Sequence, residues 1–344
     1  MPSSNVLWVP PLMRQKQFFP GQFGVHGSDT ELGQRMDSTG CVFYVDPNHV
    51  DASDDHDGTD PDHPLATVTE ALTRVGAYQN DVIAVMFNAD WTYSSLLLGR
   101  ATPIQENVTI NTPGVKLVGI APSGALGVPW LSTANSTTSI IVNAMDVLIE
   151  GFCFWDSAYT GTTAIYAQWS APTYYGENLI VRNCYFYEKG YGIVLDYAWN
   201  CFIENNTFYS IDTQCIHNSS TFGEPDFLTV RNNVFMNNAG AINLPDCDSC
   251  IIEANRFLGN TTTIIMTGAA SDNLIHGNVI VAAAAGANNM INLSGGVGTL
   301  NMVSDNYLSC SVAQYDTTCS PGGGGTDTWV RNHLVNGESA ANPT

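Results

Sequence analysis

The sequence predicts an all-β solenoid, and three observations indicate this fold class. One seven-residue apolar pattern recurs eight times from about residue 146 onward. A second apolar strand, with alternating inward and outward positions, lies between successive copies. An asparagine recurs where the first strand of each copy turns into the next. Each copy therefore reads as one rung of a structure that stacks rungs along a single axis.

The seven-residue pattern defines the rungs. Its clear copies occupy residues 148–154, 180–186, 202–208, 229–235 and 251–257, and weaker copies occupy 274–280, 302–308 and 329–335. Their spacing indicates a basic rung of about 22 residues, with insertions of up to about ten residues that form loops.

The second strand of each rung alternates with period two. We expect its isoleucines to stack inward, one per rung, at Ile165, Ile193, Ile216, Ile242, Ile264 and Ile291. The residues that follow them then face outward, namely Tyr166, Val194, His217, Asn243, Ile265 and Asn292.

The recurring turn asparagines predict a structural ladder. They are Asn206, Asn233, Asn255, Asn278 and Asn306. Asparagine tolerates left-handed backbone angles, and its side-chain amide can bond to the asparagine of the neighbouring rung.

These rungs resemble the right-handed parallel β-helix of pectate-lyase-like proteins, a superfamily that includes phage tailspikes. The opening is also similar, with Phe-Tyr-Val-Asp-Pro at 43–47 and a polar loop leading into 57–72. The resemblance implies a short capping helix, and the apolar positions Leu65, Val68, Ala71, Leu72 and Val75 have helical spacing. We therefore expect an extended N-terminal arm over 1–40, a β-helix over 41–335 and a C-terminal tail over 336–344.

Composition limits the partners. The 344 residues include 11 Lys and Arg against 32 Asp and Glu, a formal net charge of −21. Such a charge repels nucleic acids, anionic membranes and polyanionic polysaccharides. We expect neutral ligands.

The arm at 1–40 leaves two alternatives open: it folds back on its own domain, or it lies along another subunit and mediates assembly. It combines Pro10, Pro11 and Pro20 with several aromatic residues, and its first residues do not resemble a secretory signal. We expect it to anchor the chain to other virion proteins, and the likeness to tailspikes implies a homo-oligomer, most simply a trimer.

Candidate catalytic residues lie on the outward face of the second strand. Asp196 and Asp246 end equivalent strands two rungs apart, a separation of about 10 Å, and His217 projects from the rung between them. Paired carboxylates at about 5–10 Å are the machinery of glycoside hydrolysis. Candidate carbohydrate-binding residues are Tyr166, Trp169, Tyr197 and Trp199, whose rings offer apolar faces to sugars.

Basic and acidic residues alternate along another strand position. Arg182, Arg231 and Arg331 alternate with the glutamates Glu150, Glu204 and Glu253, so we expect an exposed ladder of ion pairs. The resemblance implies an Arg–Lys cluster for a lyase, which the sequence lacks. No cofactor and no tight metal site are expected, although the acidic run from Asp51 to Asp62 could hold calcium loosely.

Two functions remain open, and a third, a bacterial surface adhesin, is less favoured than both. The first, which we prefer, is a structural virion component of a bacteriophage, a capsid decoration or spike protein that contacts host glycans. The alternative is a secreted, extracellular carbohydrate-active enzyme, a polysaccharide hydrolase or lyase, that acts on a neutral glycan. The sequence leaves open whether the protein is an enzyme and leans towards no activity.

Overall fold

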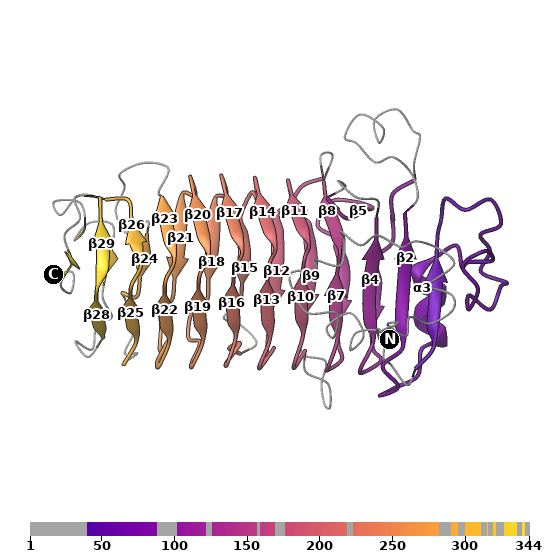
Figure 1. The fold of residues 1–344 in the computed structure, drawn as a ribbon, viewed down its shortest axis with the longest axis horizontal. Helices are drawn as coiled ribbons and strands as arrows, with labels where there is room; N and C mark the ends of the chain where they lie inside the picture. Colours follow the sequence, from indigo (N-terminus) through magenta and orange to yellow (C-terminus); the bar gives the residue numbers. More distant parts are fainter. Residues whose placement is uncertain are drawn as a thin grey trace, which may run out of the picture.

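The structure is a computed structural model. It describes residues 40–87, 102–121, 126–156, 159–168, 176–218, 223–281, 290–294, 300–310, 315, 319–320, 327–335 and 339–340. In this part of the chain, three parallel sheets wind around one axis, with one helix at the N-terminal end (Figure 1). The predicted all-β fold, a right-handed parallel β-helix with a capping helix, is confirmed. No helix in the described ranges is long and apolar enough to span a membrane.

Sheet A has eleven strands. In spatial order they are β1 (Val42–Val45), β2 (Val82–Met86), β4 (Lys116–Ile120), β7 (Leu148–Glu150), β10 (Ile180–Arg182), β13 (Phe202–Glu204), β16 (Thr229–Arg231), β19 (Ile251–Glu253), β22 (Leu274–His276), β25 (Met302–Ser304) and β28 (Thr328–Val330).

Sheet B has ten strands. They are β5 (Val128–Leu131), β8 (Phe152–Trp155), β11 (Tyr185–Tyr187), β14 (Thr207–Tyr209), β17 (Val234–Met236), β20 (Arg256–Leu258), β23 (Val279–Val281), β26 (Tyr307–Leu308), β29 (Asn332–Leu334) and β30 (Ser339–Ala340). The last pair, β29 and β30, is antiparallel.

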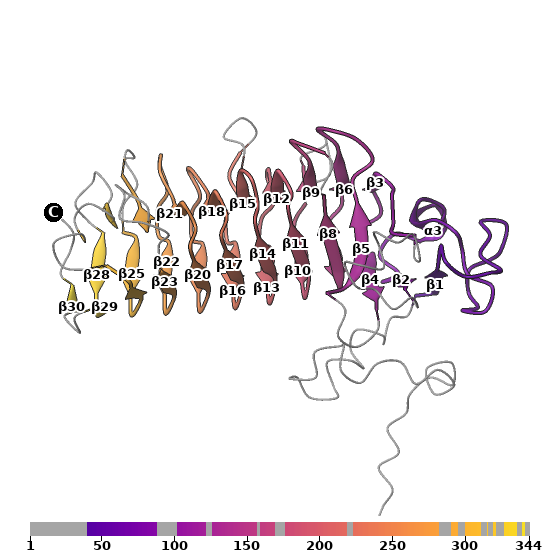
Figure 2. The same ribbon diagram turned by 90° about the horizontal axis from the view of Figure 1, so that it is seen from above.

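Sheet C has nine strands. They are β3 (Val108–Ile110), β6 (Thr138–Val142), β9 (Thr163–Ala167), β12 (Tyr191–Leu195), β15 (Gln214–His217), β18 (Gly240–Asn243), β21 (Thr262–Ile265), β24 (Ile291–Asn292) and β27 (Cys319–Ser320). In the repeated rungs the chain passes from sheet A to sheet B to sheet C and back. Figure 2 shows the same stack from above.

The core consists of stacked ladders, one residue per rung. In sheet C the predicted isoleucines pair in register and are buried, as Ile193 shows with Ile165 and Ile216 on either side. In sheet B the phenylalanines Phe186, Phe208, Phe235 and Phe257 stack with ring centroids 4.5 to 4.9 Å apart. Burial of these rows supplies most of the driving force for stacking rungs.

The predicted asparagine ladder lies at the corner between sheets A and B. The Asn233 side chain donates to the carbonyl of Ile203 at 2.8 Å and to Asn255 Oδ1 at 3.1 Å, and its own Oδ1 accepts from the backbone of Asn206 at 2.9 Å. The same contacts continue to Asn332. The expectation of a left-handed backbone at the ladder asparagines is wrong by one residue: the preceding residues, such as Asn205 and Asn232, have the positive φ.

Helix α3 (Val68–Arg74) closes the N-terminal end of the solenoid (Figure 1). Thr67 caps it by accepting from the backbone of Glu70, and the Glu106 carboxylate accepts from the backbone N–H groups of Val68 and Thr69. These acceptors satisfy donors that the first turn of a helix leaves open. Val68 and Ala71 face the core.

Candidate functional site

The outer face of sheet C brings together three of the residues selected from the sequence. Tyr166 projects from β9, His217 projects from β15, and Asp196 follows the end of β12 between them. The Tyr166 hydroxyl donates to Asp196 Oδ2 at 2.7 Å. The Asp196 side chain is fully buried, whereas Tyr166 and His217 are partly exposed. The face therefore presents a phenol and an imidazole to solvent above a buried carboxylate.

His217 is held by two neighbours. Its Nδ1 lies 3.3 Å from the carbonyl oxygen of Asn243, and its ring stacks on Tyr191 with centroids 5.8 Å apart and planes 23° apart. Burial lowers the pKa of His217, and this effect exceeds the opposing contributions of the Asn243 carbonyl and the Asp196 charge. The imidazole is therefore neutral at physiological pH, so it can both donate and accept a hydrogen bond.

Tyr166 is fixed in its protonated form. Burial raises the pKa of its hydroxyl, and the hydrogen bond to Asp196 and the negative charge of that carboxylate raise it further. The phenol is a hydrogen-bonding group here rather than a phenolate base. This argues against the use of Tyr166 as the proton-abstracting base of a lyase.

Sequence reasoning missed Tyr191 as a member of this cluster. Tyr191 begins β12 and pairs with Gln214 of β15, in an outward row separate from the one that contains His217. The sequence did contain a signal for this second outward row, because each strand begins with a residue at an equivalent position, namely Thr163, Tyr191 and Gln214.

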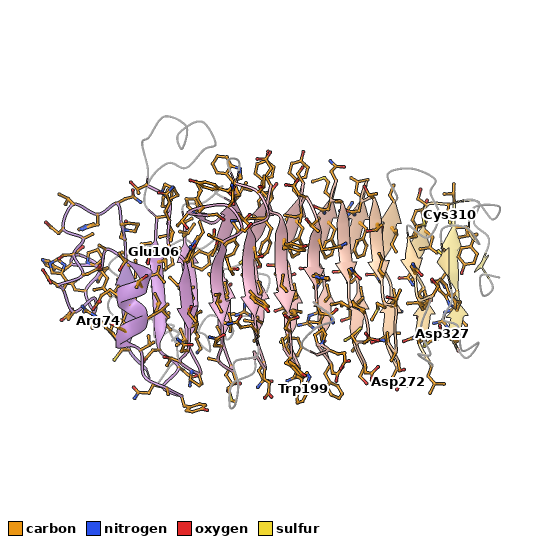
Figure 3. The ribbon with its side chains drawn as sticks, turned by 180° about the vertical axis from the view of Figure 1, so that it is seen from behind. Arg74, Glu106, Trp199, Asp272, Cys310 and Asp327 are labelled. Atoms are coloured by element: carbon orange, nitrogen blue, oxygen red, sulfur yellow. The ribbon has the colours of Figure 1, made fainter. Side chains whose placement is uncertain are left out.

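The corner between sheets C and A extends this surface. Trp199 is 39% exposed and its indole N–H donates to the carbonyl of Glu224 at 3.1 Å; Figure 3 shows the side chain at the edge of the molecule. Tyr197 packs against Gly223, whose φ is +111° and where a Cβ atom would lie 2.3 Å from the tyrosine ring. Gly223 therefore permits the next turn to approach the ring of Tyr197.

Asp246 has a different environment from Asp196. It lies in a left-handed turn with φ +61°, and its Oδ1 accepts from the backbone of Ala269 at 2.6 Å. A neighbouring charged group is Glu224, whose pKa is raised by burial and by the carboxylates of Asp226, Asp246 and Asp248. The contacts described for Asp246 thus tie it to this turn, while those of Asp196 lie on the face of sheet C. The predicted role of the two carboxylates as a catalytic pair stays a prediction.

Trp169, the remaining candidate, lies outside the described residues. The nine strands of sheet C contain no lysine or arginine. Lys189 lies just before β12 but is completely buried, so its ammonium does not reach the outer face. In the described strands, the surface that carries Tyr166 and His217 is therefore free of cations.

The predicted ion pairs of sheet A are present, but the prediction that the ladder is exposed is wrong for most of it: the side chains of Glu150, Glu204 and Arg182 are only 3%, 13% and 16% exposed, against 43% for Arg231. Arg182 Nε lies 3.1 Å from Glu150 Oε2, and Arg231 Nη2 lies 2.7 Å from Glu204 Oε2. The predicted place of Arg331 in this row is wrong by one residue, because Val330 is the residue that pairs with Ser304 there. Arg331 follows the strand and pairs with Asp305 through two contacts of 2.7 Å. These arginines thus form ion pairs with carboxylates of neighbouring rungs.

The acidic loop proposed for calcium uses its carboxylates within the loop. Asp54 accepts from the backbone of Ala66 and Thr67, and Asp57 accepts from Thr59. Weak calcium binding there stays a prediction.

A sequence model of the family described as "Periplasmic copper-binding protein (NosD)" matches residues 131–329. Copper in proteins favours thiolate, thioether and imidazole ligands. In the described ranges, no three His, Cys, Asp or Glu side chains form a group that could hold a metal ion. Burial also raises the pKa of thiols such as Cys201, Cys215 and Cys247, which keeps them protonated. The described residues do not fit a copper centre.

Solved structures provide further likenesses. The GH136 lacto-N-biosidase from Eubacterium ramulus is 12% identical with a TM-score of 0.42, and the match covers 86% of this chain and 67% of that one. Pectate lyase Pel9A is 12% identical with a TM-score of 0.42, covering 90% and 78%. The surface protein and adhesin PfbA of Streptococcus pneumoniae is 10% identical with a TM-score of 0.34, covering 73% and 83%.

No curated protein matches the chain. The family match, by contrast, spans more than half of the sequence and includes every rung that carries the site described above. The chain therefore belongs to the NosD family.

Proposed function

We propose that this protein binds a neutral glycan on the outer face of sheet C and at the adjoining corner formed by Tyr197 and Trp199. The observation that carries the proposal is the cluster of Tyr166, Asp196, His217 and Tyr191 on a face whose strands contain no cation. Sugars are bound by aromatic rings that contact their C–H faces and by fixed polar groups that bond to their hydroxyls. The corner offers the rings of Tyr197 and Trp199, and the cluster offers the polar groups, because the rings of Tyr191 and His217 already stack on each other.

The charge of the protein favours a neutral ligand over an acidic one. A uronic-acid polymer carries a carboxylate on each residue, and a chain with a net charge of −21 repels it unless local cations compensate. The sheet C strands offer no Lys or Arg for that purpose. Of the two functions left open by the sequence, the alternative of a secreted carbohydrate-active enzyme is better supported than a virion component, since the family description names a periplasmic protein.

Cleavage of the bound glycan is a second candidate function. It is favoured by the neutral His217 imidazole beside the buried Asp196 carboxylate, since a neutral imidazole can accept a proton from water. Hydrolysis also needs an acid that protonates the leaving oxygen, and Asp246 is the candidate that the sequence offers.

We place the activity outside the cytoplasm, which the word "periplasmic" in the family description supports. A trimer anchored through residues 1–40 stays a prediction.

Binding can be tested by calorimetry with neutral and uronic oligosaccharides. We expect neutral ligands alone to bind, and we expect His217→Ala and Trp199→Ala to weaken binding by about tenfold or more, the equivalent of one good polar or stacking contact. Tyr78→Ala is the matched control, because Tyr78 is 63% exposed but distant along the chain. Preference for uronic ligands, or equal affinities in all variants, would refute the proposal.

Release of reducing ends separates binding from cleavage. If the chain hydrolyses its glycan, Asp196→Asn and Asp246→Asn should each abolish that release while the corner aromatics still support binding. Persistent activity in either variant would remove that carboxylate from the catalytic role.

A further inference from the structure

We propose that the N-terminal segment of residues 5–23 docks on the outer face of sheet B of its own chain. Two outward rows form this face, and both are mainly apolar. The first row contains Tyr185, Thr207, Val234, Arg256, Val279 and Tyr307, and the second contains Trp155, Tyr187, Tyr209, Met236, Leu258 and Val281.

The face is exposed where the rows approach the C-terminal end. Leu258 is 49% exposed, Val279 39% and Tyr307 42%. Arg256 is the single charged residue in the two rows. Contiguous apolar surface of this kind is unusual on a protein without a partner and marks an interaction site.

The other two sheets are less uniformly apolar on their outer faces. Sheet A combines one apolar outward row, which includes Phe202 and Ile251, with a row of ion pairs that includes Arg182 and Glu204. Its apolar cluster at the N-terminal end is already buried. Sheet C mixes polar residues such as His217 with apolar ones in its outward row. Over the repeated rungs that the structure describes, both outward rows are mainly apolar in sheet B.

A sugar chain is a poor occupant for this face. The aromatic rings of the second row stack on one another along the axis, with Trp155 and Tyr187 at 18° and Tyr187 and Tyr209 at 11° between planes. Their flat faces are thus already covered by one another, and Trp155 is only 3% exposed. Glycan binding requires open ring faces, so an apolar polypeptide fits better.

The N-terminal segment has the matching chemistry. Residues 5–23 contain Trp8, Leu12, Phe18, Phe19 and Phe23. Residues 1–28 contain Arg14 and Lys16 but no Asp or Glu, so the rest of the chain carries the entire negative excess and attracts them.

The connection is long enough for docking within one chain. The residues between 23 and 40, fully extended, span about 55 Å. The parallel strands of sheet B, at about 4.8 Å per step, extend about 40 Å. Tethering also gives the segment a high effective concentration at this face, which favours its own chain over a second copy.

Hydroxyl-radical footprinting of the full chain tests the proposal. A variant with Trp8→Ser, Phe18→Ser and Phe19→Ser should show several-fold faster oxidation of Tyr209, Met236 and Tyr307 than the unaltered chain. Tyr78, which is 63% exposed on another part of the molecule, should react equally in both. Gln15→Ser with Gln17→Ser is the matched control and should leave protection intact.

The reciprocal variant Leu258→Lys should increase the oxidation of Trp8, with circular dichroism confirming that each variant is folded. Equal oxidation of the sheet B residues in the triple variant and the unaltered chain would overturn the proposal. Protection that depends on protein concentration, together with a doubled mass in light scattering, would also overturn it, because the occupant would then be a second copy.

Discussion

The two corners that flank sheet B satisfy their buried backbone groups in different ways. At the corner between sheets A and B, asparagines from Asn206 to Asn332 repeat the same three hydrogen bonds on every rung. At the corner between sheets B and C, Asn238 donates to Asn260 and accepts from the backbone of Ile211, but the equivalent positions of the two preceding rungs are Ile211 and Lys189, which carry no amide side chain. The comparison teaches that rungs with the same backbone path can use different side chains, amides at one corner and an ion pair at the other, to satisfy their buried polar groups.

Lys189 replaces the amide ladder with a buried ion pair. Its ammonium lies 2.5 Å from Ser132 Oγ, 3.4 Å from Ser139 Oγ and 3.4 Å from Asp156 Oδ2, and all four residues are buried. An amide ladder is neutral and contains no titratable group, so its stability does not depend on pH. The ion pair instead makes this corner sensitive to the loss of either partner and to pH.

The largest loss of stability is expected when Asp156, the counter-ion of Lys189, is removed. Asp156→Ala leaves the Lys189 ammonium buried without a carboxylate, which should lower the free energy of unfolding by about 3–5 kcal/mol. Urea unfolding measures it. Asp305→Ala, which removes the exposed partner of Arg331, is the control and should change the midpoint little. Equal midpoints for the two variants would show that the ion pair does not stabilise its corner.

The next effect is pH dependence. Burial lowers the pKa of Lys189 to about 8, against about 10.4 in an unfolded chain. Between these values the unfolded state binds the proton and the folded state does not, so the free energy of unfolding should rise with pH, by about 3 kcal/mol in total. The difference between the unaltered chain and Lys189→Met, measured by urea unfolding from pH 7.5 to 10.5, isolates this contribution. Parallel profiles would contradict it.

A smaller effect is expected in the asparagine ladder. Asn233→Leu leaves the Asn206 N–H and the Ile203 carbonyl without their partner, which should cost about 1–3 kcal/mol. Asn243→Leu, at an outward position of sheet C, is the matched control. A thermal midpoint that is unchanged in Asn233→Leu alone would indicate that water replaces the amide.

The smallest effect is expected at Arg231, an exposed member of the sheet A ion pairs. Arg231 is 43% exposed, so Arg231→Met should change the free energy of unfolding by less than about 1 kcal/mol. Any loss should shrink further in 1 M salt, because the pair is screened. A salt-independent loss as large as that of Asn233→Leu would remove the distinction between an exposed ion pair and the buried ladder.

Most of the fold could be predicted because its repeats are local in sequence. The inward isoleucines and the asparagine ladder follow from period and spacing alone, and the structure confirms both. The position of the left-handed residue, one before each ladder asparagine, could be read only in part: Asn205 and Asn232 are of a type that tolerates this conformation, whereas Ala254 is not. The buried partners of Lys189 were also hidden, since Ser132 and Asp156 come from rungs that precede the clear repeat.

The candidate site was predictable in part. The alternation of β9 and β15 places Tyr166 and His217 outward, and Asp196 was selected for its position at the strand end. Its burial beneath Tyr166 depends on side-chain packing between rungs, which periodicity does not report. The same limit applies to Asp246, whose backbone contact with Ala269 arises from the turn of the following rung.

The antiparallel strand β30 has a consequence for filament formation. A stack of parallel rungs ends in an open edge that could template another molecule, as the strands of amyloid do. In sheet B, β30 runs opposite to β29 and occupies that edge, so an incoming parallel rung cannot continue the register there. At the other end, helix α3 closes the first rungs. A fold built by repetition thus limits its own end-to-end growth.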